Sequence, residues 1–192
     1  MTQPPFAFKT SWLIRFAKAA LVFSMGLFAF LAGAGNSLDP DTNLAFVVHV
    51  LSMDTVFSPS HSGWRAITSS IVHQTVFWVI VAIELVVAAL CLWGSARLFA
   101  NLSTPAQGFN AAKGPALAGL TLGILLWFTG FIAVGGEWFL MWQSQAWNGI
   151  EAAFRFSAIL FLTLLFTVAE DRDFPNRLAG TEDVQDMFLA VE

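Results

Sequence analysis

Four long apolar segments constrain this chain more than any other feature of its sequence. Each is about as long as the 20 or so apolar residues that a helix needs to cross the hydrocarbon core of a bilayer. Backbone groups in lipid must be hydrogen-bonded internally, so such segments cross as helices. The sequence therefore predicts an all-α fold, a bundle of four transmembrane helices over residues 12–34, 70–93, 115–138 and 150–168.

The composition fits a membrane domain and excludes other classes of protein. Of the 192 residues, 57% are hydrophobic and only 11% are charged, whereas soluble domains carry about 25% charged residues. The net charge of −4 offers no basic face, so no nucleic-acid partner is expected. The single cysteine, Cys91, excludes an intrachain disulfide. We expect one membrane domain over residues 1–169 and an acidic tail over residues 170–192.

The positions of lysine and arginine predict the orientation of the helices. Cytoplasmic flanks of transmembrane helices are enriched in these two residues. Here they precede the first helix, lie between the second and third, and follow the fourth: Lys9, Arg15, Lys18, Arg97, Lys113, Arg172 and Arg177. The opposite side has only Arg65 and Arg155. Both termini, and with them the acidic tail, are therefore expected in the cytoplasm.

The first outer loop is long enough to hold a helix of its own. The residues Asp39-Pro40-Asp41 are typical of a helix start, with a capping side chain, a proline in the first turn and an acid near the positive end of the dipole. The run from Asn43 to Met53 is mostly apolar. We expect a short helix there, lying in the membrane interface or packed on the bundle.

Glu84 lies well inside the second apolar segment. A carboxyl group at that depth costs free energy of insertion and is a candidate functional group, for example in a proton or cation path. The alternative is a structural role, with a protonated carboxyl bonded to Thr121, Thr129 or the Trp127 indole of the third helix. Since no second carboxylate or lysine lies at similar depth, we expect the structural role.

Charged and aromatic residues gather at the predicted outer ends of the helices. Glu151 and Arg155 are four residues apart, in the order that favours pairing on a helix. The full candidate cluster contains Arg65, Glu137, Trp138, Trp142, Glu151 and Arg155. The cluster is either a polar pocket for a headgroup, a quinone ring or a small solute, or a set of ion pairs at the bilayer edge. We expect the ion pairs, and any binding site to lie here.

The three histidines, His49, His61 and His73, all fall on the predicted outer side. Two histidines on facing helices can ligate haem, and His49 with His73 is the one pair suitably located. A zinc or copper site with Asp54 lacks the usual ligand spacing. We therefore expect no cofactor and no metal, with His49 and His73 as the weak candidates for one.

No catalytic motif is present: the sequence has no P-loop, dinucleotide-binding glycine string, nucleophile elbow or HExxH. We expect a non-catalytic accessory or scaffolding subunit with recognition at its outer face, whose partners are membrane lipids and other membrane subunits or a second copy. Two pairs of small residues, Gly119 with Gly123 and Ala29 with Gly33, permit close helix packing inside the bundle or against another subunit. The alternatives are a small transporter or channel using Glu84, and a quinone- or haem-linked redox subunit.

Several strings on the predicted outer side resemble one bacterial, best known as proteobacterial, family of predicted small integral membrane proteins of unknown function. They are residues 49–55 (HVLSMDT), 64–67 (WRAI), 135–139 (GGEWF), 141–144 (MWQS), 147–149 (WNG) and 151–155 (EAAFR). The resemblance extends from the first to the fourth apolar segment and leaves out the tail. It implies a four-helix protein of the bacterial inner membrane, and it implies no activity, cofactor or site.

Overall fold

The computed structural model describes residues 6–58 and 61–173 of the protein, and within them every regular element is a helix. Four of these are long enough and apolar enough to cross a membrane, which confirms the predicted fold class. They are α1 (Phe6–Leu38), α3 (Ser70–Ala100), α5 (Gly114–Ile124) continued by η2 (Leu125–Trp138), and α6 (Ile150–Val168). The acidic tail from residue 174 onward lies outside the described residues.

Four short helices complete the described chain: α2 (Pro40–Ser52), η1 (Gly63–Arg65), α4 (Ala106–Ala112) and η3 (Met141–Gln143). α2 covers most of the segment where a short helix is expected, and it begins with Pro40 in its first turn, while its place in the membrane interface stays a prediction. Met53 caps its C-terminus in a left-handed conformation (φ 52°), as at many helix ends, and the Met53 N–H donates to the Val50 carbonyl. Its side chains Val47, Val50 and Leu51 are buried, so α2 packs on the other helices along one face.

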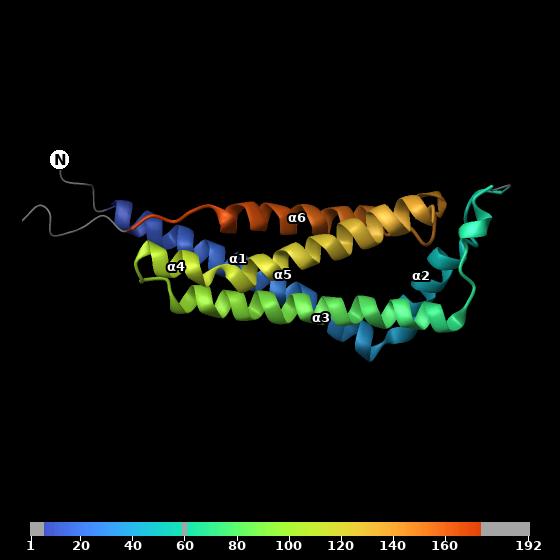
Figure 1. The fold of residues 1–192 in the computed structure, drawn as a ribbon, viewed down its shortest axis with the longest axis horizontal. Helices are drawn as coiled ribbons and strands as arrows, with labels where there is room; N and C mark the ends of the chain where they lie inside the picture. Colours follow the sequence, from blue (N-terminus) through green and yellow to red (C-terminus); the bar gives the residue numbers. More distant parts are fainter. Residues whose placement is uncertain (1–5, 59–60, 174–192) are drawn as a thin grey trace, which may run out of the picture.

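The four long helices lie side by side along the long axis of the molecule (Figure 1). α1 packs against α3, α3 against α5, and α6 against α5 and η2. At one end lie the start of α1, the short helix α4 and the chain that follows α6, including Asp171; we call this the Asp171 end. At the other end lie α2 and the segment joining it to α3, and we call this the α2 end (Figure 1).

Glycines bring the helices into close contact in the half of the molecule nearer the Asp171 end. A Cβ atom added at Gly94 would lie 2.4 Å from the backbone nitrogen of Ala116, and one at Gly119 would lie 2.7 Å from Cys91 Sγ. α3 and α5 therefore touch backbone to backbone. Gly33 and Gly123 are contacted instead by the side chains of Leu85 and Leu160, and Gly33 lies toward the α2 end of α1. The small-residue faces noted in the sequence thus pack within the chain.

The α2 end has a second, smaller apolar core. It is formed by buried side chains of α2, α3 and the segment after η2: Val47, Val50, Leu51, Met53, Phe77, Val81, Phe139 and Met141. The chain between α2 and α3 is tied to this core by backbone bonds, because Ile67 N–H donates to the Leu51 carbonyl over 2.8 Å. The Ile67 carbonyl in turn accepts a bond of 2.7 Å from His73 Nε2.

Candidate functional site

The Glu84 carboxyl is buried at the midpoint of α3, where the side chain is only 4% exposed. Asn36 Nδ2, from the last turns of α1, donates a hydrogen bond of 2.8 Å to Glu84 Oε2. Within the described chain this is the only hydrogen bond to the carboxyl. The carboxyl is thus bonded to a neighbouring helix, as expected for a structural role, but that helix is α1 and the partner is none of Thr121, Thr129 and Trp127. α1 continues to Leu38 instead of ending near residue 34, and this brings Asn36 beside α3.

A cavity of about 270 Å³ lies beside this carboxyl, and we call it the Glu84 cavity. Its polar lining consists of Glu84, Asn36 and Asn43, and none of its lining residues is lysine, arginine or histidine. Most of the remaining wall is aromatic, from α1, α2, α3, η2 and α6: Phe28, Phe46, Phe77, Trp127, Phe131 and Phe156. A mostly apolar cavity with a few convergent polar groups is the usual form of a small-molecule site.

A second cavity, of about 240 Å³, adjoins the first between α2, α3 and η2. Every residue that lines it is apolar or glycine, so we call it the apolar cavity. The two cavities share four lining residues, Phe46, Val47, Ile80 and Phe131. Among these, the rings of Phe46 and Phe131 stack with their centroids 6.3 Å apart. This ring pair is therefore part of the wall between the two cavities.

The helix that lines both cavities, η2, has π-helical winding over its whole length. At its end Phe139 N–H bonds to the carbonyl five residues earlier, at Val134. Such winding is rare in proteins and is found mostly as single turns, frequently at functional sites. Two glycines of η2, Gly130 and Gly135, line the apolar cavity, where the missing side chains leave space.

The predicted outer polar cluster is divided in the structure. Arg65 Nη1 donates to the Trp138 carbonyl over 3.2 Å, and its guanidinium lies over the rings of Trp138 and Trp64. Glu151 and Arg155 pair with each other at 3.8 Å on an exposed face of α6.

The two remaining members of the predicted cluster are exposed. Glu137 forms no ion pair in the described part of the chain, and Trp142 packs edge-on against Phe57. Among the described residues, no bond joins the Arg65 group to the Glu151 pair, so the six residues do not converge on one pocket.

The two histidines considered as weak metal or haem ligands have other contacts. His49 Nδ1 lies 2.7 Å from Asp54 Oδ2, and its ring stacks on Trp147 with centroids 4.4 Å apart. His73 Nε2 is bonded to the Ile67 carbonyl. Among the described residues, no group of three or more His, Cys, Asp or Glu side chains is arranged to hold a metal ion.

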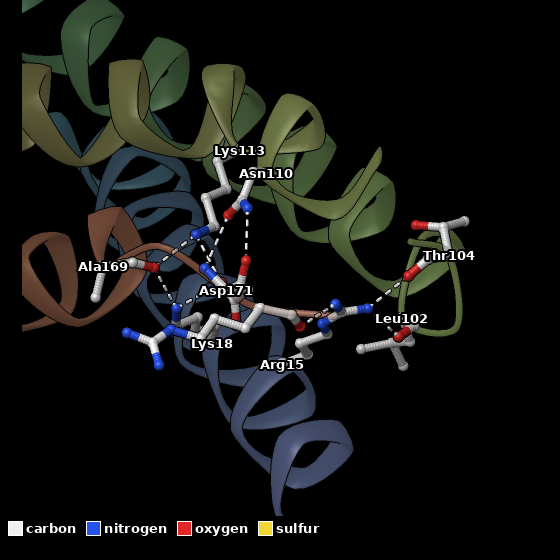
Figure 2. A network of polar contacts seen from close by, with 9 residues as sticks. Arg15, Lys18, Leu102, Thr104, Asn110, Lys113, Ala169 and Asp171 are labelled. Carbon is white, nitrogen blue, oxygen red and sulfur yellow. Dashed lines mark hydrogen bonds and ion pairs between the residues drawn. The ribbon is translucent and has the colours of Figure 1, made fainter. Parts of the chain in front are cut away.

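A buried ionic cluster at the Asp171 end was not foreseen from the sequence. Lys18 of α1 and Lys113 at the start of α5 both contact Asp171 Oδ2 at 2.6 Å (Figure 2). Both ammonium groups also donate to the Ala169 carbonyl, which ends α6, at 2.6 and 2.7 Å. Asn110 exchanges two bonds with the Asp171 backbone. The Asp171 carboxylate and the Ala169 carbonyl thus join α1, α5 and the end of α6.

Arg15 extends this cluster to the loop after α3. Its guanidinium, which is fully buried, donates to the carbonyls of Leu102 and Thr104 at 3.1 and 2.7 Å, and to that of Arg172 at 3.0 Å (Figure 2). Carbonyls at the C-terminal ends of helices carry partial negative charge. These carbonyls and Asp171 together compensate three buried cations. The cluster is therefore satisfied internally, and we assign it to stability.

Four membrane-length helices around a buried carboxyl and its cavities define a small membrane protein. The chain belongs to the family described as predicted small integral membrane protein (DUF2165), which it matches over residues 14–170. The match confirms the resemblance seen in the sequence, including the exclusion of the tail. No curated protein matches the chain, and no solved structure does.

Replacing Asp171 with asparagine should destabilise the protein strongly. The change leaves two buried ammonium groups without their carboxylate, and breaking a buried ion pair costs about 3 kcal/mol or more. We expect a clearly lower melting temperature in detergent, followed by tryptophan fluorescence or by loss of the monodisperse peak on gel filtration.

The matched control is Glu151→Gln, which removes a carboxylate from the exposed pair on α6. Glu151 is 86% exposed, and exposed ion pairs contribute little to stability, so this variant should melt like the wild type. If the Asp171→Asn variant had the same melting temperature as Glu151→Gln, the stabilising role of the cluster would be contradicted.

Proposed function

We propose that the protein binds a small lipophilic ligand within the membrane, in the Glu84 cavity, as the binding step of a small transporter. One observation carries this proposal: the buried Glu84 carboxyl, held by Asn36, lines a cavity of about 270 Å³. Ionisable groups inside membrane segments are rare and mark substrate or ion pathways in many membrane proteins.

The empty space is what favours ligand binding over a purely structural role. A carboxyl that only joined α1 to α3 would need its bond to Asn36 and close packing around it. Protein interiors are packed as densely as organic crystals, and voids lower stability. Where α3 meets α5, the glycine contacts meet that standard. The region beside Glu84 is less closely packed than this contact.

Filling the cavity should abolish binding. The probe is 1-tert-butyl-4-fluorobenzene, a compact apolar molecule, added to the protein in lipid nanodiscs and observed by fluorine NMR. We expect a bound resonance that empty nanodiscs do not give, because an apolar cavity of about 150 Å³ already accepts benzene and this mostly apolar cavity is larger. Ala32, which lines the cavity, becomes phenylalanine in the test variant, and the resonance should disappear.

The control is Leu27→Phe, which adds a ring to the same helix at a position 40% exposed and outside the cavity. This variant should keep the bound resonance. If wild-type protein gives no bound resonance, or if Ala32→Phe leaves it unchanged, the cavity is not a ligand site.

We further propose that the protein lies in the bacterial inner membrane with the Asp171 end in the cytoplasm. The support is the distribution of basic residues, with Arg15, Lys18 and Lys113 at that end and Arg65 near the other. Because Cys91 is fully buried, single cysteines introduced at Ser103 and Gly63 can be labelled selectively.

A membrane-impermeant maleimide applied to spheroplasts should label Gly63→Cys and leave Ser103→Cys unlabelled until the membrane is broken. The reverse pattern would overturn the proposed orientation. Both positions are exposed, so a lack of labelling before lysis reports sidedness.

An accessory-subunit role, with recognition at the α2 end, is a second candidate. It is favoured by exposed tryptophans around Arg65: Trp64 is 72% exposed, and Trp138 and Trp142 about half. Exposed aromatic residues beside an arginine are typical of protein interfaces. The small-residue faces give no such support, because they are used within the chain.

The partner expected under this second candidate is another membrane subunit, and native mass spectrometry after gentle extraction tests it. Wild-type protein should appear as a stoichiometric complex that Trp64→Ser disrupts and Trp93→Ser, an exposed tryptophan of α3 near its Asp171 end, preserves. Monomeric wild-type protein, or complexes unaffected by Trp64→Ser, would rule out this surface as the interface.

A further inference from the structure

The chemistry of the two cavities narrows the class of ligand. Building on the proposed function, we propose that the ligand is a cationic amphiphile: its ammonium group lies against Glu84 and its apolar tail extends into the apolar cavity. The head and the tail are argued separately below, because different residues carry them.

The head group is inferred from the charge balance of the Glu84 cavity. Glu84 is its only acidic lining residue, and the lining has no basic residue. Asn36 donates one hydrogen bond to the carboxyl, and a single neutral donor compensates a buried carboxylate poorly. A bound cation would supply the missing charge. An anion would be repelled by the ionised carboxylate. Beside a neutral ligand the carboxyl would be protonated and uncharged, so only a cation makes use of its charge.

The aromatic wall favours the same head group. Phe28, Trp127 and Phe156 form a cluster in which each ring contacts the other two, with centroids 4.5 to 5.9 Å apart. All three line the Glu84 cavity. The faces of aromatic rings attract cations, most strongly where water is excluded, and such rings recognise quaternary ammonium groups elsewhere. A carboxyl and an aromatic cluster on one cavity therefore match an organic cation better than a metal ion.

The tail is inferred from the adjoining apolar cavity. That cavity has no polar side chain in its lining, so it offers nothing to a second charged or hydroxylated group. It shares the stacked Phe46 and Phe131 rings with the Glu84 cavity. A tail attached to an ammonium group at Glu84 has only to pass this pair to reach it. The small volume of the apolar cavity and its apolar lining together favour a short alkyl or aryl chain as the tail of the ligand.

Two isosteric probes test the head group. The cation is 4-fluorophenyltrimethylammonium, and its uncharged counterpart is 1-tert-butyl-4-fluorobenzene, which has the same shape. Dissociation constants are measured by fluorine NMR in nanodiscs and corrected with empty nanodiscs. Wild-type protein should bind the cation at least about tenfold more tightly than the neutral probe, since buried charge pairs contribute that much or more.

Glu84→Gln should remove the preference for the cation while keeping the neutral probe bound, which also shows that the variant is folded. Glu137→Gln changes the net charge equally at an exposed position outside both cavities. This control should keep the preference.

A series of alkyltrimethylammonium ions from butyl to octyl, used as competitors, tests the tail. Longer chains should compete better in wild-type protein. Val76→Trp fills the apolar cavity, which Val76 lines. In this variant the octyl compound should compete no better than the butyl compound. Val79→Trp, three residues along the same helix at an exposed position, should leave the series unchanged. The comparison of two variants in the same lipid removes the effect of chain partitioning into the bilayer.

Each possible negative result of these binding experiments leads to a different conclusion. If neither probe binds, the proposed function itself is wrong. If the neutral probe binds as well as the cation, and Ala32→Phe abolishes both, the cavity is a site for a neutral ligand, such as a quinone, and the cationic class is wrong. If Val76→Trp leaves octyl unaffected, the tail does not occupy the apolar cavity.

Discussion

The contact of Lys18 and Lys113 with Asp171 is the interaction on which the arrangement of the other helices depends. It joins α1, α5 and the end of α6 at one point, and Arg15 adds the loop after α3. Buried charges cost free energy unless they are paired and hydrogen-bonded. Sliding one helix along another would separate the paired groups, so the contact fixes the positions of the helices along their axes. Asn36 lies 18 residues beyond Lys18, about 27 Å along α1. The register set at Asp171 thus places Asn36 beside Glu84.

Length and polarity in the sequence were enough to predict four membrane-length helices and to select Glu84 as the unusual group among them. They were not enough to find its partner, because Asn36 follows the apolar stretch, where the sequence predicts a loop. By their positions in the sequence, Lys18 and Lys113 are flanking charges and Asp171 belongs to an acidic tail. Their convergence depends on helices far apart in sequence, which a pattern along the chain does not record. The π-helical winding of η2 also has no evident signal in its sequence.

The cavities could not be predicted from the sequence for a related physical reason. Arg65, Glu151 and Arg155 are charged and sit near helix ends, so they attract attention in a sequence. In the structure they make local contacts, within α6 or with the Trp138 carbonyl, and they line neither the Glu84 cavity nor the apolar cavity. The cavities are lined instead by residues such as Phe46, Phe131 and Gly130, which are ordinary in an apolar sequence. A cavity forms where packed helices leave space that their side chains do not occupy, and the composition of the sequence does not indicate where that happens.

Packing is uneven along the long axis, and this affects how the molecule opens. The ionic cluster and the closest glycine contacts lie toward the Asp171 end, where a hollow of about 280 Å³ borders Arg15 and Lys18, whereas the Glu84 cavity and the apolar cavity lie toward the α2 end. Regions with fewer buried contacts open at a lower free energy than the rest of a protein. Local opening should therefore start where α2 covers α3 and η2, while the opposite end stays closed. A guest would enter and leave by displacing α2, and the exchange would proceed without separating the helices at Asp171.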